Sequence, residues 1–178
     1  MTWNDVQALW RTAEEEHWRA EYVRRGFADW WEWRKTYVDD LGLDRREWRV
    51  EVVPEPLTTV PSWFLGGWRG WKQYVPPDVA AFPTFADVAR HPALRDNRTV
   101  MDMVGQLRPT RLIALRCGGE TAVLDGTHRA AAIAVMAHDG GYAVPPIEIA
   151  VADIEPELFE RFRRGRLFVS TQPFTFAH

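Results

Sequence analysis

The side chains best suited to chemistry in this chain lie in five consecutive residues, Asp125-Gly126-Thr127-His128-Arg129. An apolar segment, 122–124, precedes them, and an alanine-rich segment that favours a helix follows directly. A strand, a glycine turn and a helix start leave free backbone N–H groups at the positive end of a helix dipole, where phosphates and other anions bind. His128 and Arg129 fall in the first turn of this predicted helix. The segment therefore predicts an anion site that both side chains can reach.

Asp125 has two interpretations. Its carboxylate can take up a proton or orient His128, which would make it part of a catalytic group. A carboxylate beside a helix start also caps free N–H groups, and in that case Asp125 is structural and Arg129 is a surface cation. Because Asp, Thr, His and Arg occur together within a single turn, we favour the anion site. Asp125, His128 and Arg129 are the candidate catalytic residues.

Composition sets limits on the function. A chain of 178 residues with 46% hydrophobic and 26% charged residues is typical of a globular protein with one core of ordinary size. It has no apolar run of about 18 residues and no amino-terminal signal pattern, so we expect no membrane partner and a cytoplasmic location. The single Cys117 excludes an internal disulfide. The net charge of −3 offers no basic platform for nucleic acid.

The ten tryptophans all lie between Trp3 and Trp71. Helical spacing of apolar residues predicts helices over 3–24 and 28–41, with His17 on an apolar stripe as a core residue. Alternation predicts a strand over 48–53. We therefore divide the chain into a Trp-rich helical extension, 1–56, and a second domain, 57–178, packed together as one compact unit.

The segment 57–77 is rich in Pro, Gly and Trp and is predicted to be a loop. One interpretation is a connection whose aromatic residues fill the edge of the core. The other is a wall for a ligand, in which Trp68 or Trp71 offers a stacking face and Arg69 or Lys72 contacts an anion. Trp68, Arg69 and Trp71 are the candidate substrate-binding residues.

The rest of the chain alternates helices and strands. Helices are predicted over 82–91, from 97 or 99 to 107, from the Asp125 segment to 138, and over 157–164. Strands are predicted over 112–117, 121–124 and 146–151, the first two joined by a hairpin at Gly118-Gly119. Glu148 alternates with two isoleucines in the last strand. It is a candidate base if its face of the sheet borders the anion site.

The segment from Arg95 to Val151 resembles the ParB/sulfiredoxin-like superfamily. It has an arginine-bearing turn at Arg98, a helix, a strand, a hairpin, and then a strand followed by D-G-x-H-R and an alanine-rich helix. The corresponding motif is D-G-H-H-R in the ParB-like free-serine kinases, G-E-R-R in partition proteins and G-C-H-R in sulfiredoxins. The resemblance implies an α+β fold, with a small mixed sheet, flanking helices and the Trp-rich helical extension in front. It also implies nucleotide phosphates at Gly126, Thr127, His128 and Arg129, with Arg98 close to the nucleotide.

The differences from the superfamily narrow the function. Thr127 stands where sulfiredoxins have their reactive cysteine, which argues against sulfinic-acid reduction. Few residues follow Val151, which argues against the DNA-binding region of partition proteins. The small-molecule kinases remain as the group that the chain resembles.

We expect a nucleotide-dependent phosphotransferase, similar to small-molecule kinases, that acts on a small polar metabolite with ATP or ADP and Mg²⁺. No sequence pattern predicts a metal site built by the protein. Two alternatives stay open: a non-catalytic module that binds a nucleotide or phosphometabolite, and a biosynthetic tailoring enzyme that uses the same loop. The sequence leaves the general base, the substrate and the oligomeric state open.

Overall fold

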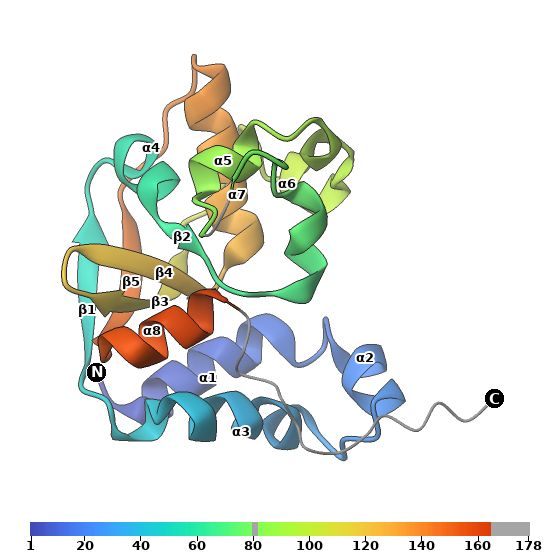
Figure 1. Ribbon diagram of the computed structural model, residues 1–178, viewed down its shortest axis with the longest axis vertical. Coiled ribbons are helices and arrows are strands. Elements are labelled where there is room, and N and C mark those ends of the chain that lie inside the picture. The colour runs from blue at the N-terminus through green and yellow to red at the C-terminus, as the bar shows by residue number, and fades with distance from the viewer. Residues whose placement is uncertain (80–81, 165–178) are drawn as a thin grey trace.

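A five-stranded mixed sheet forms the centre of the protein (Figure 1). The computed structural model describes residues 1–79 and 82–164. The strand order is β1-β5-β3-β4-β2, with antiparallel β1/β5 and β3/β4 pairs and parallel β3/β5 and β2/β4 pairs. The strands are β1 (Trp48–Val53), β2 (Phe64–Leu65), β3 (Arg111–Cys117), β4 (Glu120–Asp125) and β5 (Ile147–Asp153). The sheet and its helices confirm the expected α+β class.

One face of the sheet is covered by the amino-terminal helices and the last described helix (Figure 1). Ile113, Leu115 and Leu124 point to this face and pack with Trp10 and Trp30 in one buried cluster. The covering elements include three helices that precede the sheet and one that follows it: α1 (Trp3–Glu14), α2 (Arg19–Arg24), α3 (Trp30–Leu41) and α8 (Pro156–Arg163). The tryptophan-rich region is therefore one layer of the core.

The opposite face is covered by the middle of the chain (Figure 1). Leu112, Ala114 and Val123 point to this side and pack with the buried alanines of α7. Because helices cover both faces of the sheet, the sequences of β3 and β4 contain continuous apolar runs. The turn η1 (Leu43–Arg45) belongs to the first layer, where Leu43 is buried. The other helices and 3₁₀ turns are α4 (Pro56–Thr59), α5 (Phe85–Ala89), α6 (Arg98–Met101), α7 (Thr127–Asp139), η2 (Val60–Ser62), η3 (Arg69–Tyr74) and η4 (Pro92–Asp96).

The predicted division at residue 56 falls between β1 and the rest of the sheet. β1 pairs with β5 from Trp48 opposite Ala152 to Val53 opposite Ile147. Residues 165–178 of the predicted second domain lie outside the described residues.

Among the described residues, no helix combines the length and apolar character needed to span a bilayer.

Three sequence predictions of secondary structure differ from the structure. The helix predicted over 3–24 is interrupted between α1 and α2, so the apolar stripe ends early and His17 is exposed rather than a core residue. The loop predicted over 57–77 contains α4, η2, β2 and η3. The helix predicted to reach residue 107 ends at Met101. The strand β2 within 57–77 could not be predicted from local sequence, because a two-residue strand has no periodicity and exists only through pairing with β4.

Candidate functional site

The site is centred on the turn between β4 and α7. The β3/β4 register shifts near its end, so that Asp125 rather than Leu124 stands opposite Ile113. Gly126 then adopts φ +90°, and a Cβ atom there would lie 2.4 Å from Leu112 Cδ2. Only glycine combines this conformation with so close a neighbour. The bulge and the glycine together direct the chain from the strand into the helix.

The start of α7 has no side-chain cap. The first helical bond runs from the Ala130 N–H to the Gly126 carbonyl at 2.9 Å. The N–H groups of the preceding first-turn residues, Thr127 to Arg129, have no acceptor within the helix and point outward from its positive end. The uncapped helix start that an anion site requires is therefore present after Gly126.

Arg129 points into the protein. Its Nη2 donates to Asp125 Oδ2 at 2.9 Å, and its Nη1 donates to Thr110 Oγ1 at 2.5 Å and to the Arg111 carbonyl at 3.1 Å. The guanidinium thus ties the first turn of α7 to the start of β3. This side chain holds the loop in shape and supplies positive charge beside the helix start.

Asp125 is a buried carboxylate, with 12% of its side chain exposed. Burial raises the pKa of Asp125 from 3.8 to about 6, and the nearby charge of Glu14 raises it further, against the opposing charge of Arg129. A carboxyl group with this pKa exchanges a proton near neutral pH, as a general acid or base requires.

The amino-terminal helices bring a second ion pair to this place. Arg34 of α3 donates from Nε to Glu14 Oε2 of α1 at 2.6 Å, and only 5% of the Arg34 side chain is exposed. The Trp30 indole N–H also donates to Glu14 Oε2, at 3.2 Å. The guanidinium of Arg34 lies 3.6 Å from the ring centre of Trp33. Since Glu14 and Arg34 both act on the Asp125 pKa, the two ion pairs form one electrostatic cluster.

His128 lies between the tryptophan-rich loop and the amino-terminal region. Its ring meets the edge of Trp71 with ring centres 5.0 Å apart. Burial lowers the pKa of His128 to about 4, helped by the positive charges of His17 and Arg129. The imidazole is therefore neutral at pH 7. It offers hydrogen bonds to a ligand but no charge.

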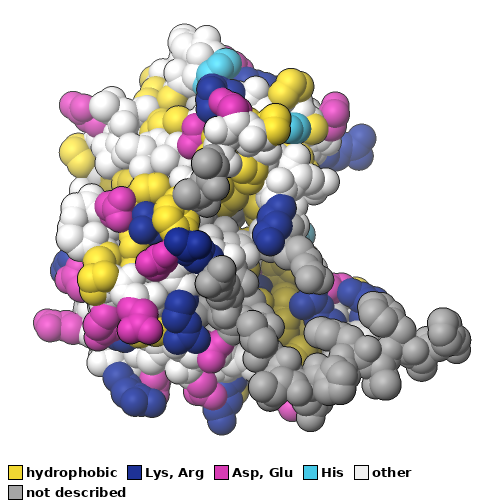
Figure 2. Space-filling model, in the orientation of Figure 1, with side chains coloured by type: hydrophobic (Ala, Val, Ile, Leu, Met, Phe, Trp, Pro, Cys, Tyr) yellow, Lys and Arg dark blue, Asp and Glu magenta, His cyan; other side chains and the backbone are white. Residues whose placement is uncertain are grey.

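The surface is hollowed beside these residues. Figure 2 shows a hollow between η3, which carries Trp71, and the α1–α2 region, which carries His17. Trp68 lies on the same side, with its ring 5.3 Å from Tyr37 and 6.0 Å from Phe162. Of the predicted substrate-binding residues, Trp71 thus contacts the 125–129 turn and Trp68 lies against the Arg34 cluster. The side chain of Arg69 lies outside what the structure describes.

Two further candidates are not joined to Asp125 by a contact among the described side chains. The side chain of Arg98 is exposed at the start of α6 and makes no hydrogen bond or ion pair with the described residues. Glu148 is exposed and accepts from Arg111 Nε at 3.0 Å. Within the described part of the chain, neither side chain forms a hydrogen bond or ion pair with Asp125.

Sequence reasoning missed Glu14 and Arg34 entirely. The signal available was weak, because Glu14 and Arg34 are each one of several charged residues on two tryptophan-rich helices. Their pairing depends on how α1 and α3 pack on the sheet. Among residues 1–79 and 82–164, no group of three or more His, Cys, Asp or Glu side chains is arranged to hold a metal ion.

The arrangement can therefore bind an anion at a helix start, beside a carboxyl group that exchanges a proton near neutral pH. Comparisons with protein-family models, with curated proteins and with solved structures found no match to this chain.

Proposed function

We propose that this protein is a phosphotransferase that holds the phosphates of a nucleotide at residues 126–129 and transfers a phosphoryl group between the nucleotide and a small polar molecule. One observation carries the proposal: the uncapped start of α7 lies beside Asp125, whose pKa is raised to about 6. A site for anions and a site for a proton then share one turn. The resemblance of the Asp125-Gly126-Thr127-His128-Arg129 segment to the free-serine kinases supports the same assignment.

In the forward direction the hydroxyl oxygen of the acceptor forms a bond to the terminal phosphorus atom, and the bond from that phosphorus to the bridging oxygen breaks. The hydroxyl proton passes to the carboxylate of Asp125, and the nucleotide leaves as the diphosphate. The N–H groups of Thr127 and His128 bind the phosphoryl oxygens, and Arg129 adds positive charge beside them.

A magnesium ion on the nucleotide would neutralise phosphate charge, as it does in other phosphoryl transfers. Among the described residues, no group of three or more His, Cys, Asp or Glu side chains is arranged to hold this ion, so the nucleotide phosphates and water would bind it. Glu14 is bound to Arg34 and Trp30, so Asp125 is the better proton acceptor.

Thr127 offers a sharp test of phosphate binding. Thr127→Asp keeps the side-chain size and adds a negative charge at the helix start, whereas Thr127→Val keeps the shape without the charge. Calorimetric titration with ATP, ADP and CTP, each with Mg²⁺, should give micromolar binding to the unaltered protein. Thr127→Asp should weaken that binding more than about tenfold, a change of about 1.4 kcal/mol, and Thr127→Val should weaken it far less. Equal binding by the two variants, or none by the unaltered protein, contradicts the proposal.

Turnover is a separate measurement. Formation of ADP from ATP is followed with a panel of small hydroxylated acceptors, for the unaltered protein and for Asp125→Asn. If Asp125 accepts the proton, the variant should lose turnover while it keeps nucleotide affinity. Parallel loss of both would assign Asp125 a structural role at the turn.

The alternative function is a non-catalytic module that binds a nucleotide or phosphometabolite. The observation that favours it is the inward direction of Arg129, whose three hydrogen bonds go to groups of the protein itself. Nucleotide binding that depends on Thr127, without turnover of any acceptor, would select this alternative.

A further inference from the structure

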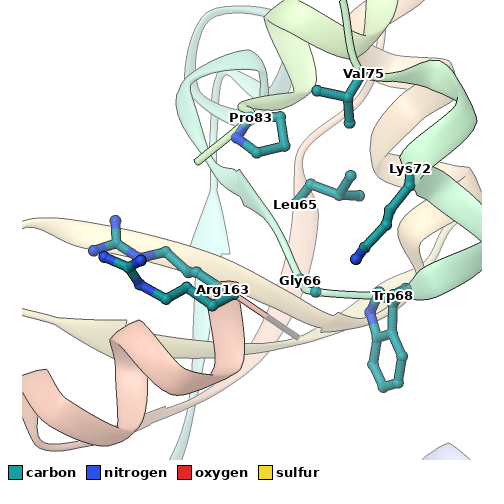
Figure 3. Close-up of a pocket in the computed structure, with 9 residues that line it drawn as sticks. Leu65, Gly66, Trp68, Lys72, Val75, Pro83 and Arg163 are labelled. Atoms are coloured by element: carbon teal, nitrogen blue, oxygen red, sulfur yellow. The ribbon is translucent and has the colours of Figure 1, made fainter. Parts of the chain in front are cut away.

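A cavity of about 480 Å³ lies at the end of β2, between η3 and the carboxyl end of α8 (Figure 3). Its wall includes Leu65, Gly66, Trp68, Lys72 and Arg163. Because β2 runs parallel to β4, with Leu65 opposite Val123, the two chains leave the sheet at the same edge. The segment Gly66–Trp68 therefore leaves the sheet beside the turn that carries Asp125. Ligands of sheet proteins commonly bind at such carboxyl ends of parallel strands.

Lys72 is the available cation of this cavity. Its side chain is exposed and has no hydrogen bond or ion pair with any described residue. Figure 3 shows its ammonium end directed toward the space between Gly66 and Trp68. A lysine that points into a cavity without a counter-ion favours an anion from outside the protein.

The two arginines at the opposite wall each form an ion pair with a glutamate. Arg163 donates from Nη1 to Glu120 at 3.2 Å, and its guanidinium lies 4.1 Å from the ring centre of Phe82, while its buried Nε makes no hydrogen bond with the described residues. Arg164 donates from Nε to Glu160 at 2.8 Å. They raise the positive potential of the cavity, and Lys72 is left as the direct ligand.

A second polar group at the wall lacks a partner among the described residues. The indole N–H of Trp68 is buried and makes no hydrogen bond there. A Cβ atom at Gly66 would lie 2.8 Å from this nitrogen, so the glycine keeps the backbone close to it. A buried donor without an acceptor is uncommon, but this nitrogen is shielded from solvent, so a ligand in the cavity reaches it only if Trp68 or Gly66 moves.

The remaining wall is apolar. Leu65, Val75 and Pro83 line the cavity above Lys72 (Figure 3). An ion with no apolar part would leave this surface in water. The lining therefore fits a small molecule that combines an anionic group with an apolar body.

We propose that this cavity is the acceptor subsite and that Lys72 binds the anionic group, a carboxylate or a phosphate, of a small acceptor with an apolar portion. Anion binding by Lys72 stands on the cavity alone. Its assignment to the acceptor rests on the proposed phosphotransfer at the neighbouring turn.

The sequence offers an internal reference for the test, because Lys35 and Lys72 are the only lysines of the chain. Both are exposed, and Lys35 lies on α3 outside the cavity wall. Trace acetylation with acetic anhydride, read by mass spectrometry, gives the ratio of modification at the two positions. The probes are 3-phenylpropionate, phenyl phosphate, inorganic phosphate, and the neutral 3-phenylpropanol.

We expect 3-phenylpropionate or phenyl phosphate to lower modification of Lys72 alone. A probe at ten times its Kd leaves about one tenth of the site free, so the Lys72 to Lys35 ratio should fall nearly tenfold. Protection by 3-phenylpropionate would identify the bound group as a carboxylate, and protection by phenyl phosphate would identify it as a phosphate. The neutral 3-phenylpropanol should not change the modification ratio. An unchanged ratio with every anion, or equal protection by the neutral alcohol, overturns the proposal.

Calorimetry with the same probes separates this proposal from the first one. Lys72→Gln should weaken binding of the protective anion more than tenfold, and Lys35→Gln should leave it unchanged. If the anion binds through Lys72 but no nucleotide binds, the cavity is an anion site and the phosphotransfer proposal fails. If nucleotide binds and Lys72 stays unprotected, the subsite is wrong and the phosphotransfer proposal survives.

Discussion

Arg129 and Asp125, four residues apart, form an ion pair of 2.9 Å that closes the turn between β4 and α7. The pair is shielded from water, with 24% of the arginine and 12% of the aspartate side chain exposed. The same guanidinium holds Thr110 and the Arg111 carbonyl. The two residues therefore maintain the shape of the turn in addition to any part they have in chemistry.

Removal of this guanidinium should destabilise the protein. Arg129→Ala leaves a buried carboxylate and two acceptors without a donor, and we expect a loss of about 3 to 5 kcal/mol in the free energy of unfolding. Urea unfolding measures the loss. Asp125→Asn combined with Arg129→Ala should show a coupling energy of about 1 to 3 kcal/mol, and purely additive losses would mean that the pair does not act together.

Gly126→Ala should destabilise the protein for two reasons: alanine is strained in the left-handed conformation, and its Cβ atom would clash with a neighbour. Gly42 is the matched control, because both glycines are left-handed, with φ +60° and ψ 38° at Gly42 and φ +90° and ψ 23° at Gly126. A Cβ atom at Gly42 would lie 3.7 Å from Arg46 Nη2, an ordinary contact, whereas at Gly126 it would lie 2.4 Å from Leu112 Cδ2. We expect Gly42→Ala to cost about 1 kcal/mol, the conformational part alone. Gly126→Ala should cost about 3 kcal/mol, because the buried Leu112 must also move. Similar melting temperatures for the two variants would contradict the tight contact.

The ion pair between Glu14 and Arg34 should be essential to the first helical layer. Glu14→Gln leaves the guanidinium of Arg34 buried without a counter-charge, and we expect a loss of about 3 kcal/mol in the free energy of unfolding. Glu15→Gln, one residue further, breaks an exposed pair with Arg11 and should change stability little. Urea unfolding measures both variants, and equal losses of unfolding free energy would contradict a larger contribution from the buried pair.

The pH dependence of stability should reveal Asp125 and His128 as opposing groups. The folded pKa of Asp125, about 6, lies above its usual 3.8, so its contribution to stability is complete below 3.8 and is lost as the pH rises through 6. The folded pKa of His128, about 4, lies below its usual 6.5, so its contribution is complete above 6.5 and is lost as the pH falls through 4. The two contributions nearly cancel between these limits.

Single substitutions should separate the two contributions. In Asp125→Asn only the His128 contribution remains, so the free energy of unfolding should rise between about pH 4.5 and about pH 6. In His128→Gln only the Asp125 contribution remains, so the free energy of unfolding should fall over the same range. Each slope should differ from that of the unaltered protein by up to about 1.4 kcal/mol per pH unit. Urea unfolding at several pH values measures both slopes. Parallel slopes in the two variants would contradict the assigned pKa directions.

Local sequence determined most elements and the centre of the site. The apolar runs of β3, β4 and β5, the hairpin at Gly118-Gly119 and the helix after Gly126 follow from spacing and turn residues within a few positions. The end of α3 at Gly42 follows from its left-handed conformation, φ +60°. For the same reason the strand, the glycine and the helix start of the 125–129 turn could be predicted, and the anion site that they suggest stays a prediction.

The tertiary structure alone decided what surrounds that turn. Glu14 and Arg34 lie 20 positions apart on two helices, and only the packing of α1 and α3 on the sheet brings them together beside Asp125. β2 forms through a parallel pairing with β4, which no local pattern encodes. Arg129 points inward because Thr110 and Arg111 offer acceptors from a distant strand start. Contacts of this kind depend on chain segments far apart in sequence, whereas spacing reports only on neighbours along one helix or strand.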